Sequence, residues 1–444
     1  MKWIFLAGLM VLTPLLAMWL RNHQRHLPLA AFFLGLLPFL EVRFNIVASP
    51  YTWSTWQGIA KGIDLSLVDA VAIAMIYAGG RMRTPVRIKL AVAFYLFAWV
   101  VSTSVAAIKV PSIFYLWTLV RCALIYYAIA RASASNRDVP IALMTGLIVG
   151  LSIQGVVALQ QKLGGDIQAG GWFGHQNLLG MASHFVIYPA FAAFLGGYYQ
   201  RRALLCVGVA FMIAWTGGSR ATIGLMGAGL ILTTILSCRY RMTSRKMTIA
   251  ALGTIALVVA APILIGAIDR RSELTREGST EEREQMKKAA AMIIADYPLG
   301  IGSNRYVAVA NVGGYNARAG LQWSAFKAVA HNTFYLVTAE MGWLGLIGII
   351  GVFAAVFSLA LSDMARAAPG FSKEYSIGIA VTVLMVVAHS NFEWIFMMLS
   401  IHMLFAMTVG VLVALRGMPH TVQKTAATAR TASGDLAGVV GQPA

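Results

Sequence analysis

The sequence has little charge for its length. Only 12% of its 444 residues are Asp, Glu, Lys or Arg, whereas 59% are hydrophobic and the mean hydropathy is +0.72. So few charges cannot cover the surface of soluble domains, and long apolar runs are typical of membrane spans. The sequence therefore predicts an all-α polytopic membrane protein, with residues 1–420 forming one integral domain.

Cysteine and the usual metal or nucleotide motifs are also scarce. The cysteines, Cys122, Cys206 and Cys238, lie far apart without CxxC spacing, which predicts neither a zinc site nor a disulfide framework. The sequence has no HExxH, P-loop, dinucleotide-binding glycine motif or GxSxG elbow. An Asp-x-Asp pair that would hold a divalent metal against a diphosphate is missing as well. We therefore expect no metal and no cofactor, and we expect arginine to stabilise the charge on a leaving group.

The formal net charge of +18 does not indicate a nucleic-acid partner. The basic residues fall in short loops between apolar runs, where orientation in the bilayer explains them. Every second loop from residue 63 onward is basic, and these loops are predicted to be cytoplasmic: 81–89, 131–138, 201–202, 239–246, 366–373 and the chain from 416. Residues 421–444 are rich in Ala, Thr, Gly and Ser, which predicts a disordered cytoplasmic tail.

Apolar runs predict the number of membrane spans. The candidates are 3–20, 27–40, 63–79, 88–108, 112–131, 139–160, 177–196, 203–216, 220–238, 247–268, 332–361, 375–390 and 394–415. The second run is short and contains Pro28 and Pro38, so one of the first two is expected not to span. We predict about 12 transmembrane helices, with 13 as the alternative, and a first run that is retained as an anchor. Tyr51, Trp53 and Trp56 indicate interfacial aromatic anchors on the outer side.

Residues 269–331 carry far more charge than the rest of the chain and predict one large, partly helical loop on the outer side. Ser279 and Glu282 form a capping-box pattern that begins a helix, and Pro298 ends it. The apolar residues of this helix share one stripe: Met286, Ala290, Ile293 and Tyr297. Arg283 lies on the same stripe, either as a snorkelling edge residue or as a buried cation that awaits an anion.

Arg220 follows Ser219 in an outer turn, where the positive-inside rule does not favour a cation. Ser219 is expected to cap the next helix, which places Arg220 at the positive end of a helix dipole. A bound anion would reverse this unfavourable placement, because amides at a helix start and a guanidinium together bind phosphate. The alternative is an interfacial arginine that contacts lipid headgroups.

His331 and Asn332 stand where the charged loop re-enters the membrane. An imidazole can accept a proton near neutral pH, so His331 is a candidate general base, although a lone histidine is more often structural. Glu340 lies on the opposite side of the same helix. It is therefore expected to pair with a polar group on another helix rather than to orient His331.

Several other polar or small residues have less specific patterns. The outer segment 171–177 suits a contact with a sugar or a lipid headgroup, and a plain turn equally. Arg121 lies in the middle of an apolar run and needs a polar cavity or a partner. The remaining histidines of the spans are expected to be packed and hydrogen-bonded: His184, His389 and His402. Glycines at every third position favour a close helix–helix contact: Gly342, Gly345, Gly348 and Gly351.

An ordered set of short motifs resembles the O-antigen ligase and polymerase superfamily of bacterial inner-membrane glycosyltransferases. The motifs are Gly174-His175-Gln176-Asn177, Gly218-Ser219-Arg220-Ala221, Arg283 followed by Tyr297-Pro298-Leu299-Gly300-Ile301-Gly302, and His331-Asn332 with Glu340, Gly342 and Gly345. They follow the family's order between residues 170 and 350, whereas the N-terminal third matches only in hydropathy. One departure is Met286-Lys287, where many relatives have an aromatic residue after the arginine.

The resemblance implies an O-antigen ligase at the periplasmic face of the inner membrane. Such an enzyme transfers a preassembled glycan from undecaprenyl diphosphate to a sugar hydroxyl of lipid A-core, with inversion and without metal. By the resemblance, Arg220 and Arg283 bind the diphosphate and His331 activates the acceptor. Further substrate contacts are expected from four residues: Arg305, His175, Asn177 and Asn332.

The sequence leaves other functions open. An O-antigen polymerase or a protein O-oligosaccharyltransferase would use the same three residues. A polyprenyl-glycan transporter or flippase belongs to a different class, which predicts ionisable residues at the bilayer midplane, broken helices and an internal repeat. Only Arg121 and a few histidines qualify and no repeat is visible, so we favour the transferase. Its expected partners are the lipid-linked donor, the lipid A-core acceptor and membrane lipids.

Overall fold

The computed structural model describes residues 2–44, 46–256, 258 and 278–417. The predicted tail 421–444 and residues 269–277 of the predicted outer loop lie outside this part of the chain. Within it the chain is mainly helical, and it contains one two-stranded sheet.

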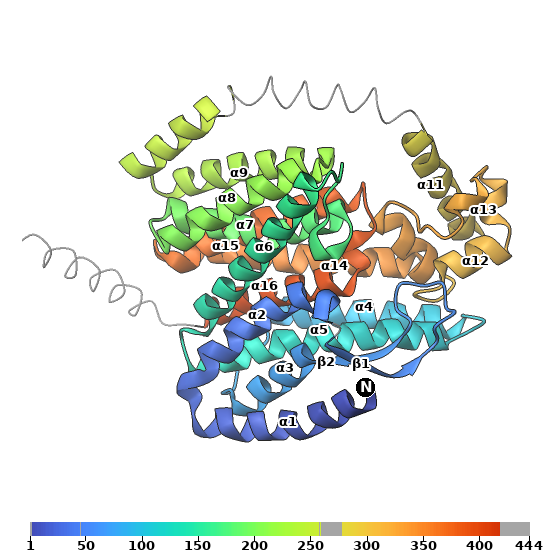
Figure 1. Ribbon diagram of the computed structural model, residues 1–444, viewed down its shortest axis with the longest axis horizontal. Coiled ribbons are helices and arrows are strands. Elements are labelled where there is room, and N and C mark those ends of the chain that lie inside the picture. Colours follow the sequence, from blue (N-terminus) through green and yellow to red (C-terminus); the bar gives the residue numbers. More distant parts are fainter. Residues whose placement is uncertain (1, 45, 257, 259–277, 418–444) are drawn as a thin grey trace, which may run out of the picture.

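The elements are labelled as in Figure 1. In chain order they are α1 (Lys2–Asn22), η1 (Gln24–His26), α2 (Leu27–Phe44), β1 (Val47–Thr52), β2 (Gly62–Ser66), α3 (Leu67–Ala78), α4 (Val86–Ser104), α5 (Val110–Ser135), α6 (Val139–Leu163), η2 (Gly171–Phe173), α7 (Gln176–Leu195), α8 (Gln200–Gly217), α9 (Arg220–Tyr240), α11 (Gly278–Asp296), α12 (Tyr306–Val312), α13 (Tyr315–Arg318), η3 (Trp323–Ala325), α14 (Thr333–Arg366), α15 (Phe371–Ser390), η4 (Ile395–Met397) and α16 (Leu399–Arg416). Residues 244–256 are also helical and cover part of the predicted run 247–268.

Nine helices in the described ranges are long and apolar enough to cross a membrane: α1, α4, α5, α6, α7, α9, α14, α15 and α16. This agrees with a polytopic helical membrane protein. The predicted span 63–79 is different, because its first residues belong to β2 and only the 12-residue α3 follows. Ser66 caps this helix, and the carboxylate of Asp69 in its first turn accepts a hydrogen bond from the Ser66 amide (2.8 Å).

Residues 47–66 form an antiparallel hairpin that the sequence did not predict. β1 pairs with β2 so that Val47 lies opposite Ser66. Trp56, in the loop between the strands, is buried, and its Nε1 donates a hydrogen bond to the carbonyl of Asn304 (3.0 Å). The predicted interfacial role is therefore wrong for Trp56, which anchors the hairpin to the segment 278–331 instead.

The helix α7 lies in the middle of the bundle (Figure 1). Of the most apolar 18-residue stretch of α7, 94% is buried inside the protein, whereas the corresponding share is 17% for α1 and 22% for α4. Glycines bring its neighbours close. A side chain at Gly378 of α15 would meet the backbone of Pro189 at 2.5 Å, and Gly180 lies against Thr222 of α9. Because α9 and α15 pack directly on α7, the ends of these helices are held in a constant arrangement.

Arg121 of α5 is almost fully buried and is neutralised by two carboxylates. Its Nε lies 2.8 Å from Asp69 Oδ1, and its Nη2 lies 3.3 Å from Glu41 Oε1. Nη2 also donates a hydrogen bond to Ser66 Oγ (2.7 Å). The predicted need for a partner is confirmed, and the interaction joins α5 to α2 and to the start of α3.

The long helices separate two groups of loops at opposite ends of the bundle. One end contains the starts of α7, α9, α14 and α16 and the end of α15. The other end contains the opposite termini of these helices. The basic segments 81–87, 133–137 and 416–417 line a single pocket at this second end, which agrees with their predicted placement on one side of the membrane.

The helix α14 is interrupted at Gly342, whose backbone has φ 68° and is not helical. The segment 298–302 lies against this break. The Trp343 amide donates a hydrogen bond to the carbonyl of Pro298 (3.2 Å), and the Gly302 amide donates to the carbonyl of Glu340 (2.9 Å). The break thus joins the start of α14 to the segment that follows α11.

The predicted run of helix-contact glycines holds only in part. A side chain at Gly348 would meet Tyr95 of α4 at 2.9 Å, as expected for a close helix contact. At Gly351 nothing lies within 4 Å, and Gly342 serves the break in α14 instead. The predicted role is therefore wrong for Gly342 and Gly351.

We expect Gly342→Ala to destabilise the protein by about 2–4 kcal/mol. Its Cβ would lie 2.5 Å from the Pro298 carbonyl oxygen, and an L residue is strained at this positive φ. The matched control is Gly351→Ala in the same helix, where open space predicts no loss or a small increase in stability. Thermal unfolding in detergent measures both, and equal midpoints for the two variants would contradict this account of the break.

Candidate functional site

Side chains from three distant parts of the chain contact the buried carboxylate of Glu393. Glu393 lies in the turn between α15 and η4 and is 1% exposed. Its Oε1 accepts hydrogen bonds from Arg283 Nη2 (2.8 Å) and Asn177 Nδ2 (2.5 Å), and its Oε2 lies 3.1 Å from His331 Nδ1. We call these four residues the Glu393 cluster.

The start of α14 holds His331 in place. Asn332 caps this helix, because its Oδ1 accepts hydrogen bonds from the amides of Phe334 (2.9 Å) and Tyr335 (3.0 Å). Its Nδ2 donates to the carbonyl of Asn391 (2.9 Å). Both ends of this amide thus make hydrogen bonds within the protein, which fix the start of α14 next to His331; its predicted substrate contact stays a prediction.

A second link fixes the turn that carries Glu393. Thr333 donates from its Oγ1 (2.8 Å) and its amide (3.2 Å) to the backbone carbonyl of Glu393. The segments 331–333 and 391–393 are therefore joined by backbone as well as by side chain. This double connection fixes the imidazole of His331 relative to the carboxylate.

Arg283 comes from α11, which packs through the predicted stripe. Met286, Ala290 and Ile293 are buried as predicted, whereas Tyr297 is 45% exposed because it lies beyond the last helical residue, Asp296. The helix is described from Gly278, and the side chains of the predicted capping pattern at 279–280 lie outside the described part. The Arg283 side chain is 40% exposed, so its guanidinium contacts Glu393 on one side and is open on the other.

His175 and Asn177 enter from the start of α7. Two glutamines hold the preceding turn, since Gln154 Oε1 accepts a hydrogen bond from the Trp172 amide (2.8 Å) and Gln161 Oε1 accepts one from the Gly171 amide (2.8 Å). His175 Nδ1 accepts from the Asn177 amide (3.2 Å) and so caps α7. The predicted outer motif therefore supplies Asn177 to the Glu393 cluster.

The charges of the cluster shift the pKa values of its acids and bases. Burial acts to raise the pKa of Glu393, but the hydrogen bond from His331 and the positive charge of Arg283 outweigh it, and the pKa is lowered. Burial lowers the pKa of His175; the attraction of Glu393 opposes this, and the positive charge of Arg283 supports it. At neutral pH the site therefore contains an ionised Glu393 beside a neutral His175.

Arg220 lies at the start of α9 and is exposed. Ser219 caps this helix as predicted, because its Oγ accepts a hydrogen bond from the Thr222 amide (3.3 Å). Thr222 packs on Gly180, one turn into α7 from Asn177. The starts of α7 and α9 are thus neighbours, and Arg220 lies at the same end of the bundle as the Glu393 cluster.

Arg305 belongs to a different group of residues. It is buried at the start of α12, and its Nη1 donates a hydrogen bond to the carbonyl of Ile301 (2.7 Å). Glu340 lies nearby and accepts hydrogen bonds from the amides of Asn304 (2.7 Å) and Tyr306 (2.9 Å). Arg305 makes no hydrogen bond or ion pair with the Glu393 cluster in the described ranges, so its predicted place among the substrate-binding residues is not supported.

Glu393 is the residue that the sequence interpretation missed. It is 62 residues from His331 and 110 from Arg283, so no local pattern connects them. The available signal was a single carboxylate in the short outer turn 391–393, between two apolar runs. An acid in that place needs a cation, and Arg283 and His331 were both predicted on the same side.

The cluster can orient a base and bind an anion. The carboxylate accepts the Nδ1–H of His331, which leaves Nε2 as the nitrogen that can take a proton from a substrate hydroxyl. The His331 side chain is 22% exposed, whereas that of Glu393 is 2% exposed. Within the described residues no group of three or more His, Cys, Asp or Glu side chains could hold a metal ion.

The lowered pKa of Glu393 predicts a pH dependence of stability. A carboxyl group whose pKa is lower in the folded state stabilises the protein above its unfolded pKa, which is about 4.3 for Glu, and this contribution disappears as the pH falls below that value and through the lower folded pKa. We therefore expect the unfolding midpoint of Glu393→Gln to fall less over this range than that of the wild type. Glu281→Gln, which changes an exposed carboxylate of α11, should follow the wild type; an identical profile for all three proteins would contradict the prediction.

Part of the chain is similar to a known family. Residues 203–350 match a family model described as O-Antigen ligase, and this range includes Arg220, Arg283 and His331 but not Glu393. No curated protein matches the chain significantly. Members of the matched family are glycosyltransferase-like enzymes that act on polyprenyl-linked glycans. The similarity to this family covers one third of the chain, 148 of its 444 residues.

Proposed function

We propose that the protein is an O-antigen ligase, which transfers a preassembled glycan from undecaprenyl diphosphate to a sugar hydroxyl of lipid A-core. The observation that carries the proposal is the Glu393 cluster, in which a guanidinium and an imidazole from separate segments meet at one buried carboxylate. The family match supports the reaction class. The choice of lipid A-core as acceptor rests on the sequence motifs.

In the proposed reaction His331 is the general base. Its Nε2 takes the proton of the acceptor hydroxyl as the new oxygen–carbon bond forms at the anomeric carbon of the glycan, with inversion. Glu393 then stabilises the imidazolium that results, as the acid does in a Ser-His-Asp triad. Glu393 is a positioning residue in this scheme, because its carboxylate is almost completely buried.

Arg283 and Arg220 stabilise the leaving group. As the bond from the anomeric carbon to the phosphate oxygen breaks, negative charge increases on the polyprenyl diphosphate, and guanidinium donors compensate it. Arg283 donates one hydrogen bond to Glu393 and keeps further N–H groups on its open side. Arg220 adds a second guanidinium at the start of α9, where the helix dipole also favours an anion.

The site would lie on the periplasmic face of the bacterial inner membrane. Support comes from the arginine-rich loops, which gather at the other end of the bundle and are expected on the cytoplasmic side. No nucleotide donor is present outside the cytoplasm, so a lipid diphosphate that carries its own leaving group suits this placement.

A polymerase is the second candidate, because the family match includes ligases and polymerases and does not separate them. The two differ in the acceptor only: a polymerase joins glycan units to one another.

We therefore expect purified protein, with lipid-linked glycan and lipid A-core but no nucleotide, to form ligated product that EDTA does not abolish. Elongation of the donor glycan without lipid A-core would identify a polymerase instead, and loss of product with EDTA would contradict the proposed role of arginine.

We expect Arg283→Lys to reduce kcat/KM by about 10²-fold or more. Lysine keeps the charge but cannot donate to Glu393 and to a phosphate oxygen with the planar geometry of a guanidinium. The control is Arg318→Lys, an exposed arginine of the same segment that stacks on Tyr315 and lies outside the Glu393 cluster. Full activity of Arg283→Lys in the transfer assay would remove Arg283 from the mechanism.

A further inference from the structure

A pocket of about 740 Å³ lies at the end of the bundle opposite the Glu393 cluster. Its walls come from the start of α4, the end of α5, the last third of α14 and the end of α16. The 18 residues of α16 separate it from the turn that carries Glu393, which corresponds to about 27 Å of helix. This distance is close to the thickness of the hydrocarbon core of a bilayer.

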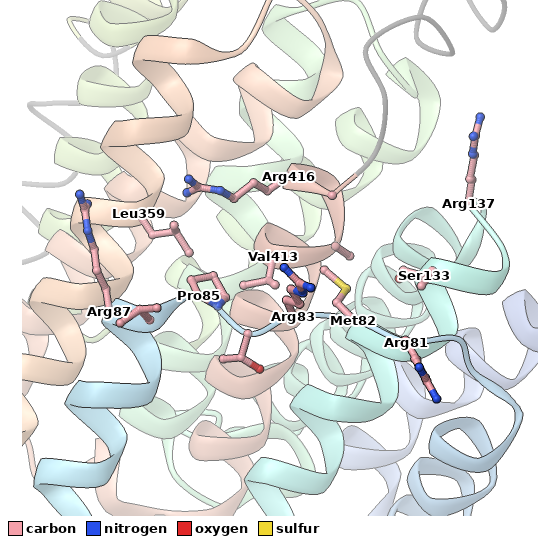
Figure 2. A pocket seen from close by; sticks show the side chains of 15 residues that line it. Arg81, Met82, Arg83, Pro85, Arg87, Ser133, Arg137, Leu359, Val413 and Arg416 are labelled. Carbon is pink, nitrogen blue, oxygen red and sulfur yellow. The ribbon is translucent and has the colours of Figure 1, made fainter.

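Five arginines line this pocket: Arg81, Arg83, Arg87, Arg137 and Arg416. Figure 2 shows Arg83 near the middle of the group, with Arg87 and Arg416 on one side and Arg81 and Arg137 on the other. None of the described residues that line the pocket is acidic. Such a concentration of guanidinium groups is unfavourable unless an anion compensates it.

Little of this charge is neutralised by the protein. Arg416 pairs with Asp363 (3.0 Å), and Arg87 donates a hydrogen bond to the carbonyl of Ser358 (3.4 Å). In the part of the chain that the structure describes, Arg81, Arg83 and Arg137 make no hydrogen bond or ion pair with another residue. Three guanidinium groups in the pocket therefore keep all their donors for a ligand.

A buried hydroxyl adds a second, independent feature. Ser133 lines the pocket and is only 4% exposed, yet its Oγ has no hydrogen-bond partner among the described residues. Buried polar atoms are rarely left unpaired. A phosphate oxygen in the pocket would supply the missing partner.

The rest of the pocket is apolar and continues along a helix. Leu359 and Val413 line the pocket beside the arginines, and Val86 begins an exposed apolar stripe on α4. The stripe consists of residues spaced four, four and three apart: Val86, Leu90, Phe94 and Phe97. A soluble anion would make no contact with this stripe, whereas the acyl chain of a lipid would cover it.

We propose that this pocket binds the headgroup of an anionic phospholipid, with its phosphate on Arg81, Arg83 and Arg137 and an acyl chain along α4. Basic pockets between membrane helices on the cytoplasmic side suit such headgroups. The lipid would bridge the α4–α14 pair and the α5–α16 pair, whose ends form the walls. The site is independent of the transfer reaction, since it shares no residue with the Glu393 cluster.

The test measures lipid binding to full-length protein in detergent by native mass spectrometry. The probes are phosphatidylglycerol, cardiolipin and phosphatidylcholine, with inorganic phosphate and glycerol phosphate in separate arms. We expect the anionic lipids to bind at least about tenfold more tightly than phosphatidylcholine and to resist competition by the soluble anions. Equal binding of all three lipids would overturn the proposal, and tight binding of phosphate alone would show a soluble-anion site and overturn the lipid assignment.

Matched variants locate the binding. Arg83→Gln combined with Arg137→Gln removes two exposed guanidinium groups of the pocket and should weaken anionic-lipid binding about tenfold or more. The control is Arg239→Gln combined with Arg241→Gln, which removes the same charge from exposed residues at the same end but outside the pocket. Arg83→Lys with Arg137→Lys should give an intermediate loss. Equal losses in the pocket and control variants would show general surface attraction and overturn the proposal.

Discussion

The ion pair between Arg283 and the buried Glu393 is the interaction on which the proposed site depends. A carboxylate with 2% of its side chain exposed is stable in its ionised form only when cations and hydrogen-bond donors surround it. Arg283, His331 and Asn177 supply these partners. The charge of Glu393 thereby holds together α11, the start of α14 and the start of α7, and it orients the imidazole that the proposed mechanism needs.

Two further constraints keep this arrangement rigid. The segment 298–302, which follows α11, packs against the break in α14 at Gly342. Backbone hydrogen bonds therefore join this segment to α14, the helix that follows His331. The central position of α7 fixes Asn177 and the start of α9 relative to one another. Other buried charges have a different role: Arg121 pairs with Asp69 and Glu41 and joins α5 to α2 and α3, so there the same chemistry stabilises the fold.

Local pattern predicted much of the fold and part of the site. The stripe of α11 placed Arg283 on the packed side, and the serine before Arg220 predicted the cap of α9. The errors have physical causes. The hairpin 47–66 was missed because its loop is anchored by Asn304, 248 residues from Trp56, and the capping role of Asn332 was missed because it requires the actual start of α14. Arg305 appeared available because its burial against Ile301 and Glu340 is a property of packing.

By itself the sequence determined that this is a helical membrane protein, that its basic loops share one end, and that Arg220, Arg283 and His331 are the polar residues to consider. These conclusions rest on hydropathy, charge placement and helical period, which act over a few residues. The tertiary structure decided which carboxylate the cations meet, that Gly342 breaks a helix, and that five arginines surround one pocket. The partners of Glu393 lie 62 to 216 positions away from it in the chain, and only the packing of helices brings them within hydrogen-bond distance.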